Sequence, residues 1–188
     1  MKKVLLVALC VLTLVCLCAC DNNSYKKMDK AVSAEYSTIK ISVEAKKGTD
    51  KLMSTIDVSN KDGKSTVVYH LENFTEISAD SIPDSYITVR EGTVEIANGT
   101  VSGDKLADVD FTKATRLPYT FHKSFFDDAN FNKGVFTASV AFPRLFTGNN
   151  SLVSTNMTVT FSYEAAEKVL VVSYEAKGVD VKITYTMS

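Results

Sequence analysis

Residues 38–45 read TIKISVEA, and this stretch decides the fold because its apolar and polar side chains alternate. Ile39, Ile41, Val43 and Ala45 share one phase of that alternation. Successive side chains of a strand point to opposite faces of a sheet, so a period of two predicts a strand with one buried face. Half-buried strands of this kind are typical of antiparallel sheets.

The same alternation continues through most of the chain. It recurs in residues 52–59, 65–74, 86–97, 134–142, 157–164, 168–176 and 179–187. Asp62-Gly63 and Asn98-Gly99 stand between such segments, and these dipeptides are strong signals for two-residue hairpin turns. We therefore predict one mainly β (α+β) domain over residues 24–188, built on a long, curved antiparallel sheet.

Two segments are predicted to be helical. Residues 24–36 place Met28, Val32 and Tyr36 near helical spacing, and Ser24 stands where it can cap the first turn. We expect an N-terminal helix there. A second short helix is expected near residues 122–131, HKSFFDDANF, inside the least periodic part of the chain.

The N-terminus has the pattern of a secretory signal peptide. Lys2 and Lys3 precede an apolar run over residues 4–17, interrupted only by Thr13. The run is shorter than the roughly 20 residues that a helix needs to span a bilayer. A basic start, an apolar run of this length and small residues at its end predict a cleaved segment, residues 1–19.

The end of that segment resembles a bacterial lipobox. Leu17, Cys18, Ala19 and Cys20 match its order of an aliphatic residue, two small residues and a cysteine, although cysteine is unusual at the second place. The resemblance implies a lipid on Cys20, cleavage after Ala19 and a tether over residues 20–23. It also implies an extracytoplasmic domain on the outer face of the cytoplasmic membrane, because two acyl chains anchor a protein stably.

The cysteines offer two other interpretations, a metal site and a redox pair. Cys18-Ala-Cys20 lacks the two-residue spacer of both, and no cysteine follows Cys20. Asp21 would favour retention at the inner membrane in some Gram-negative bacteria and would carry no sorting meaning in Gram-positive ones. Both hosts stay open.

The sequence shows no catalytic motif, no cofactor site and no metal site. The formal net charge is −1, which argues against a nucleic-acid partner. His70 is expected to face solvent, because it is out of phase with Tyr69 in its strand. His122 is a weak candidate for a catalytic base, and Asp108 with Asp110 is a weak candidate for a calcium pair.

Aromatic residues crowd into one aperiodic region. They are Phe111, Tyr119, Phe121, Phe125, Phe126, Phe131, Phe136, Phe142 and Phe146. This region either fills the inner side of the sheet as a plug or lines an apolar pocket. The candidates for the lining of such a pocket are Phe121, Phe125, Phe126, Phe136 and Phe142.

The order of a helix, a meander of alternating strands and a final strand pair, VLVVSYEAKGVDVKITYTM at residues 169–187, is similar to carriers of the LolA and LppX type. That resemblance implies a curved sheet around an apolar cavity for acyl chains. The first hypothesis is therefore a non-catalytic, membrane-anchored carrier or binding domain for a hydrophobic small molecule or lipid. The alternatives are an interaction module for an envelope protein and, third, an enzyme.

Overall fold

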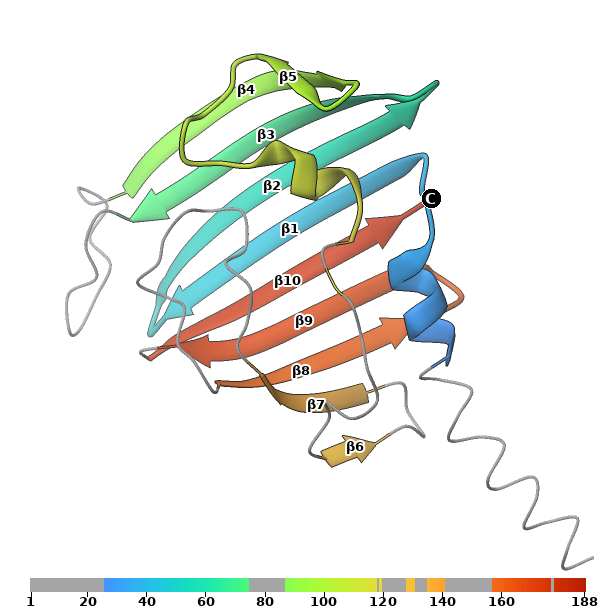
Figure 1. Ribbon diagram of the computed structural model, residues 1–188. Coiled ribbons are helices and arrows are strands. Elements are labelled where there is room, and N and C mark those ends of the chain that lie inside the picture. The colour runs from blue at the N-terminus through green and yellow to red at the C-terminus, as the bar shows by residue number, and fades with distance from the viewer. Residues whose placement is uncertain are drawn as a thin grey trace, which may run out of the picture.

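The chain forms one antiparallel sheet with short helical segments on one of its faces (Figure 1). The computed structural model describes residues 26–74, 87–117, 119, 128–130, 135–140, 157–176 and 178–188. These residues are mostly strand, so the expectation of a mainly β antiparallel domain is confirmed. None of the helices within these ranges is long and apolar enough to cross a membrane.

Within the described residues, the sheet has ten strands. They are β1 (Thr38–Lys47), β2 (Asp50–Lys61), β3 (Lys64–Phe74), β4 (Ile87–Ala97), β5 (Thr100–Gly103), β6 (Asp128–Asn130), β7 (Val135–Val140), β8 (Met157–Glu164), β9 (Val169–Ala176) and β10 (Val179–Met187). Their spatial order is β5-β4-β3-β2-β1-β10-β9-β8-β7-β6, and neighbouring strands run antiparallel. The sheet is open, with β5 and β6 at its two edges.

The first and last strands of the domain pair at its centre. The β1–β10 ladder runs from Ile39 opposite Met187 to Lys46 opposite Asp180. From this ladder, one meander of hairpins leads outward to β5 and the other to β6. The two halves of the sheet therefore depend on pairing between residues far apart in the sequence, which slows folding in antiparallel β proteins.

The predicted tight turns are confirmed. Asp62 and Gly63 have φ values of 52° and 73°, and Asn98 and Gly99 have φ values of 50° and 74°. Two consecutive positive φ angles are the signature of the type I′ turn, whose twist matches that of the flanking strands. The turns fix the register of β2 with β3 and of β4 with β5.

The helical segments differ from the expectation. The structure describes a helix over residues 26–33, which ends before Tyr36, and Ser24 lies outside the described residues. The helix predicted near residues 122–131 is wrong for Asp128–Asn130, which pair with β7 as strand β6, while residues 122–127 and 131 lie outside the described ranges. A 3₁₀ helix, η2 (Phe111–Thr115), occurs earlier in the chain, where the Asp110 side chain caps its start.

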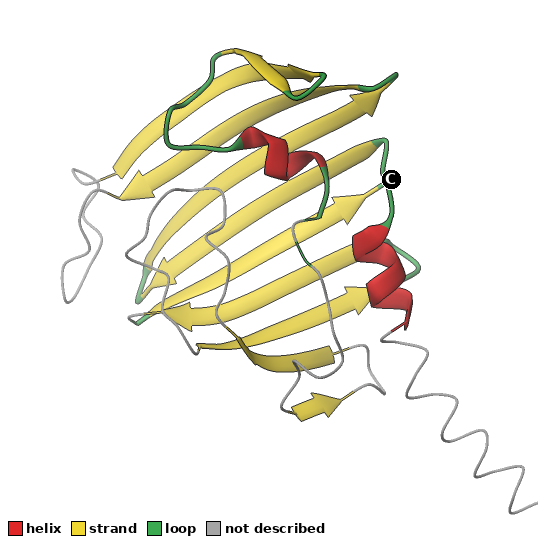
Figure 2. Cartoon of the chain, in the orientation of Figure 1, coloured by secondary structure: helices red, strands yellow, loops and turns green. Residues whose placement is uncertain are grey.

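The two faces of the sheet have opposite character. The core face carries the apolar phase of each strand, and η2 and the helix at residues 26–33 lie on that side (Figure 2). Fully buried core-face side chains include Ile41, Ile56, Leu71, Leu170, Ile183 and Tyr185. Ser54 is the only buried non-aromatic polar side chain among the described residues. The other face, called the outer face below, is polar and largely exposed.

Candidate functional site on the core face

Residues 104–117, called the crossing segment, run from β5 over the core face and include η2 (Figure 1). Arg90 of β4 holds the start of this segment. Its guanidinium Nη1 donates to both carboxylate oxygens of Asp108, at 2.7 and 2.9 Å. This hydrogen bonding lowers the pKa of Asp108, against a smaller opposing effect of burial. The ion pair therefore fixes the crossing segment to the β4 edge.

Tyr69 of β3 makes a second contact with the crossing segment. Its hydroxyl donates to the backbone carbonyl oxygen of Asp104 at 2.6 Å, and the Asp104 carboxylate accepts from the backbone N–H of Thr93 at 3.1 Å. Gly92 lies opposite Tyr69 in the ladder, and a Cβ there would stand 2.7 Å from the Tyr69 hydroxyl. The absence of a side chain at Gly92 makes room for the tyrosine.

Phe111 fills the space between η2 and the sheet. Its ring centroid lies 4.8 Å from that of Tyr69, and its side chain is buried. Asp110 caps η2 by accepting from the Thr112 hydroxyl and from the backbone N–H of Thr112 at 3.2 Å. The hydrogen bond from the hydroxyl is the largest cause of the lowered pKa of Asp110. Asp108 and Asp110, the predicted calcium pair, are thus occupied by Arg90 and by the cap of η2.

Asn60 joins three parts of the chain at the far end of the crossing segment. Its side-chain N–H groups donate to the backbone carbonyl oxygens of Tyr36 at 2.8 Å and Thr115 at 3.1 Å. Its side-chain oxygen accepts from the Ser65 hydroxyl at 2.6 Å. The amide therefore connects the linker before β1, the end of η2 and the start of β3.

Tyr119 lies on the other half of the core face, where it contacts β8 and β10. Its ring packs edge-on against Phe161 of β8 at 5.7 Å and against Tyr185 of β10 at 5.6 Å. The hydroxyls of Tyr119 and Tyr185 form a buried hydrogen bond of 2.8 Å. Burial raises the pKa of both hydroxyls, and it raises the pKa of Tyr174 on neighbouring β9 to about 12. These tyrosines are neutral at any physiological pH.

Few of the predicted site residues lie within the described part of the chain. Cys20, Phe121, Phe125, Phe126 and Phe142 lie outside the described residues, as does His122, and Phe136 is described only as part of strand β7. Phe111 and Tyr119 are the described aromatics of this region that contact the core face, and both are buried there. Where these two side chains lie, the core face is filled.

His70 faces the outer side, as the alternation predicted. Its Nδ1 is hydrogen-bonded to Glu91 of β4, and its Nε2 lies 3.4 Å from Glu72. The hydrogen bond to Glu91 is the largest cause of a raised pKa of His70, and Glu72 adds to it. Within the described ranges, no group of three or more His, Cys, Asp and Glu side chains is arranged to hold a metal ion.

Sequence reasoning missed a groove at the Asn60 junction, called the junction groove. Its volume is about 520 Å³, and its lining residues are Glu35, Tyr36, Ser37, Asn60, Lys61, Asp62, Gly63, Lys64, Ser65, Thr115 and Arg116. The basic residues on both sides of the Asp62-Gly63 turn, Lys61 and Lys64, were the sequence signal that could have indicated this groove. No sequence signal indicated that Arg116 belongs to this groove, because its place beside the turn depends on the path of the crossing segment.

No family model matches this chain, and no curated protein matches it. The function is therefore inferred from the fold and from the geometry described above.

Proposed function

We propose that this chain is a non-catalytic, extracytoplasmic lipoprotein domain, anchored through Cys20, that binds or carries an apolar or lipid-like ligand. The lipobox-like sequence supports the anchor. The continuous apolar core face of an open antiparallel sheet supports the class of ligand, because acyl chains bind to apolar surfaces that exclude water.

One asymmetry carries the proposal. On β2, β3 and β4, directional bonds hold the crossing segment: the Arg90–Asp108 ion pair, the Tyr69–Asp104 bond and the Asn60–Thr115 bond. On β8 and β10, the contacts of Tyr119 include two edge-on ring contacts and one hydroxyl hydrogen bond, all between neutral side chains. An apolar ligand beside these neutral side chains would not have to separate an ion pair, whereas on β4 it would meet the Arg90–Asp108 pair. We assign the ligand to the β8–β10 half.

The proposal is tested by purifying the full chain from a bacterial host and extracting it for lipid mass spectrometry. The expected result is a stoichiometric lipid or other hydrophobic molecule, together with an acylated Cys20 in the intact mass. Phe125→Ser and Phe142→Ser are expected to reduce the bound amount, since serine replaces an apolar side chain with a polar one. Val89→Ser is the matched control, because Val89 is 53% exposed on the outer face. A clean protein that takes up no fatty acid would refute the carrier role.

A specific observation favours an envelope interaction module as the second candidate. Val68 and Val89 are 51% and 53% exposed on the outer face, close to His70 and Glu72. Exposed apolar side chains that gather beside charged ones are typical of protein interaction sites. Photocrosslinking from position 68 in intact cells would then give one discrete adduct, and crosslinking from Thr55 would serve as the comparison.

A further inference from the structure

The junction groove carries three cationic side chains. Lys61, Lys64 and Arg116 make no ion pair within the described part of the chain, although Glu35 and Asp62 also line the groove. In a second groove, of about 470 Å³ on the outer face, one of the two lining lysines, Lys46, is paired. There Glu44 binds Lys46 at 2.9 Å and Lys51 at 2.6 Å.

The floor of the junction groove is preorganised. Asn60 uses both amide hydrogens and its oxygen on Tyr36, Thr115 and Ser65, so its three surrounding segments keep their positions. The Asp62-Gly63 turn sets the spacing between the ends of β2 and β3. The floor is therefore saturated with internal hydrogen bonds, and the groove offers an incoming ligand its three cationic side chains on the rim.

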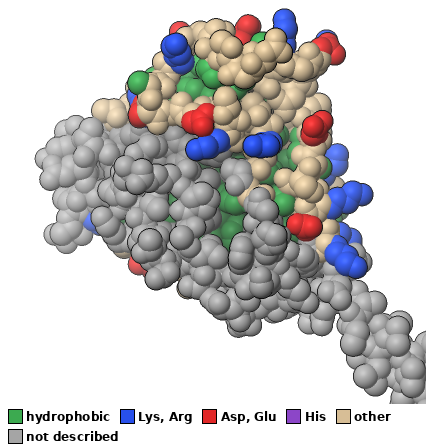
Figure 3. All heavy atoms as spheres, viewed as in Figure 1, with side chains coloured by type: hydrophobic (Ala, Val, Ile, Leu, Met, Phe, Trp, Pro, Cys, Tyr) green, Lys and Arg blue, Asp and Glu red, His purple; other side chains and the backbone are tan. Residues whose placement is uncertain are grey.

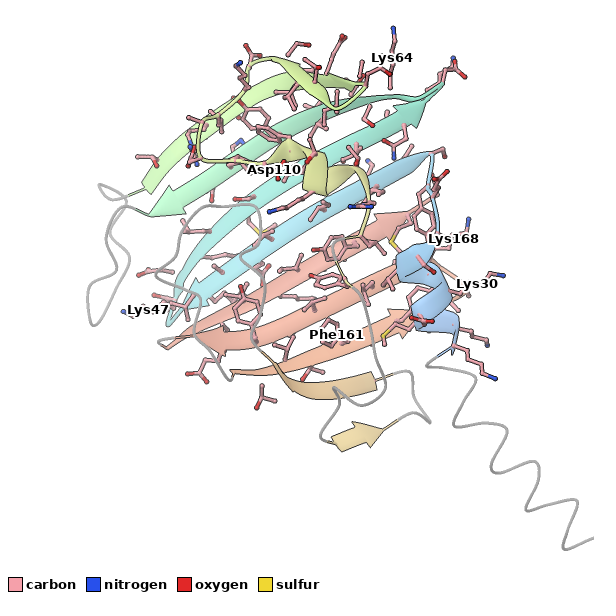
Figure 4. The ribbon with its side chains drawn as sticks, viewed as in Figure 1. Lys30, Lys47, Lys64, Asp110, Phe161 and Lys168 are labelled. Atoms are coloured by element: carbon pink, nitrogen blue, oxygen red, sulfur yellow. The ribbon has the colours of Figure 1, made fainter. Side chains whose placement is uncertain are left out.

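The groove lies at the end of the sheet where the described part of the chain begins. Figure 4 shows Lys64, Lys168 and Lys30 toward that end of the strands and Lys47 at the opposite end. Only residues 21–25 separate Cys20 from Lys26, and such a stretch extends to about 20 Å at most. The helix at residues 26–33 adds about 12 Å and leads directly to the groove residues Glu35 and Tyr36.

The charge at this end complements a bilayer. Lys26, Lys27 and Lys30 are exposed on the helix, and basic side chains gather along this side of the molecule in Figure 3. Basic residues within about 10 Å of a membrane are attracted to anionic lipids, because the surface potential decays over the Debye length. The anchor and the basic residues therefore act on the same end of the domain.

We propose that the junction groove binds the phosphate headgroup of an anionic phospholipid, with Lys61, Lys64 and Arg116 around the phosphate. This inference rests on the proposed lipid anchor, which brings the groove to the bilayer. Bound there, the headgroup orients the sheet with its helical end toward the membrane. Lipid transfer to or from the bilayer would then occur at that end.

The binding test uses the full chain in neutral detergent, titrated with dihexanoyl phosphatidylglycerol. We expect saturable binding that weakens with salt, and weaker binding of dihexanoyl phosphatidylcholine, whose phosphate is compensated by its own cation. Replacing Lys61, Lys64 and Arg116 together by Gln is expected to raise the dissociation constant by about fivefold per cation removed. The matched control replaces Lys40, Lys51 and Lys182 by Gln and keeps wild-type affinity. Equal losses in both variants, or equal binding of inorganic phosphate and phosphatidylglycerol, would overturn the inference.

A second measurement needs no variant. The full-length protein is reconstituted into vesicles of phosphatidylcholine alone or with phosphatidylglycerol, and its lysines are acetylated briefly and quantified by peptide mass spectrometry. Lys61 and Lys64 are expected to be protected severalfold in the anionic vesicles, whereas Lys40 and Lys182 react equally in both. Unchanged Lys61 and Lys64 would contradict the inference. The mass of the Cys20 peptide tests the anchor separately, so a flat titration with an acylated Cys20 overturns only the headgroup site.

Discussion

The Tyr119 hydroxyl lies 2.8 Å from the Tyr185 hydroxyl in the interior of the protein, and each is the hydrogen-bond partner of the other. Tyr185 belongs to the central strand pair, whereas Tyr119 follows the crossing segment. This pair therefore joins the crossing segment to the half of the sheet to which we assign the ligand. A neutral hydroxyl pair closes an apolar surface without placing charge on it.

Removal of one hydroxyl from this pair is expected to destabilise the protein. Tyr119→Phe or Tyr185→Phe removes the hydrogen bond between the two buried hydroxyls, which costs about 1–3 kcal/mol. The double variant is expected to recover part of that loss, because neither hydroxyl then remains. Denaturant unfolding of the four proteins gives the coupling energy, and Tyr163→Phe on the partly exposed end of β8 is the control. Strictly additive losses would show that the two hydroxyls do not depend on each other.

Gly92→Ala tests the close approach of Tyr69. The new methyl group would stand 2.7 Å from the Tyr69 hydroxyl and 2.6 Å from the Asp104 Cβ, so the ring and the crossing segment must shift. Overpacking of this kind costs about 1–3 kcal/mol. The free energy of unfolding, measured against Thr66→Ala on the outer face, reports the loss. An unchanged value would mean that the crossing segment does not lie on β4 as described.

The Arg90–Asp108 ion pair is expected to make the free energy of unfolding depend on pH in the acidic range. The pKa of Asp108 is lowered in the folded protein, so its contribution is present above the unfolded value of about 3.9 and is lost as the pH falls through the folded value. Because both side chains are partly exposed, we expect less than about 1 kcal/mol. Urea unfolding of wild type and Asp108→Asn should therefore differ at pH 6 and converge toward pH 3. A constant difference would exclude the ion pair as its source.

His70 is expected to give the free energy of unfolding a pH dependence of the opposite sign. Its pKa is raised in the folded state, so its contribution is complete below the unfolded value of about 6.5 and disappears as the pH rises through the folded value. His70→Gln is expected to be less stable than wild type at pH 6 and equally stable at pH 9. The groups that face the imidazole are Glu72 and Glu91, and Glu91→Gln should reduce the pH dependence. Histidine chemical shifts give the pKa directly, and a value at or below 6.5 would contradict this account.

The sheet was predictable because each strand buries one face and exposes the other. Ile39, Ile41 and Ala45 carry that signal in β1, and Val181, Ile183 and Tyr185 carry it in β10. The glycine turns at Gly63 and Gly99 fixed the hairpins in the same way. The position of His70 on the outer face followed from its phase alone.

The core-face contacts were not predictable from the sequence. The pairing of Tyr119 with Tyr185 depends on the path of an aperiodic segment, and periodicity gives no information about such a path. Gly92 appeared as one residue of an alternating strand, and its role became visible only when Tyr69 was found opposite it. Asp108 and Asp110 looked like a ligand pair because the sequence does not show that Arg90 and η2 occupy them.

The most direct test of the proposed function places a fluorophore on the core face. The chain contains no tryptophan, so Tyr174→Trp on β9 gives a single reporter on the half assigned to the ligand, and Val68→Trp on the outer face gives its control. Titration of each full-length variant with a brominated fatty acid measures contact, because bromine quenches tryptophan at short range. We predict saturable quenching for Tyr174→Trp and little for Val68→Trp. Absence of quenching at position 174, or equal quenching at both positions, would contradict an apolar ligand site on the core face.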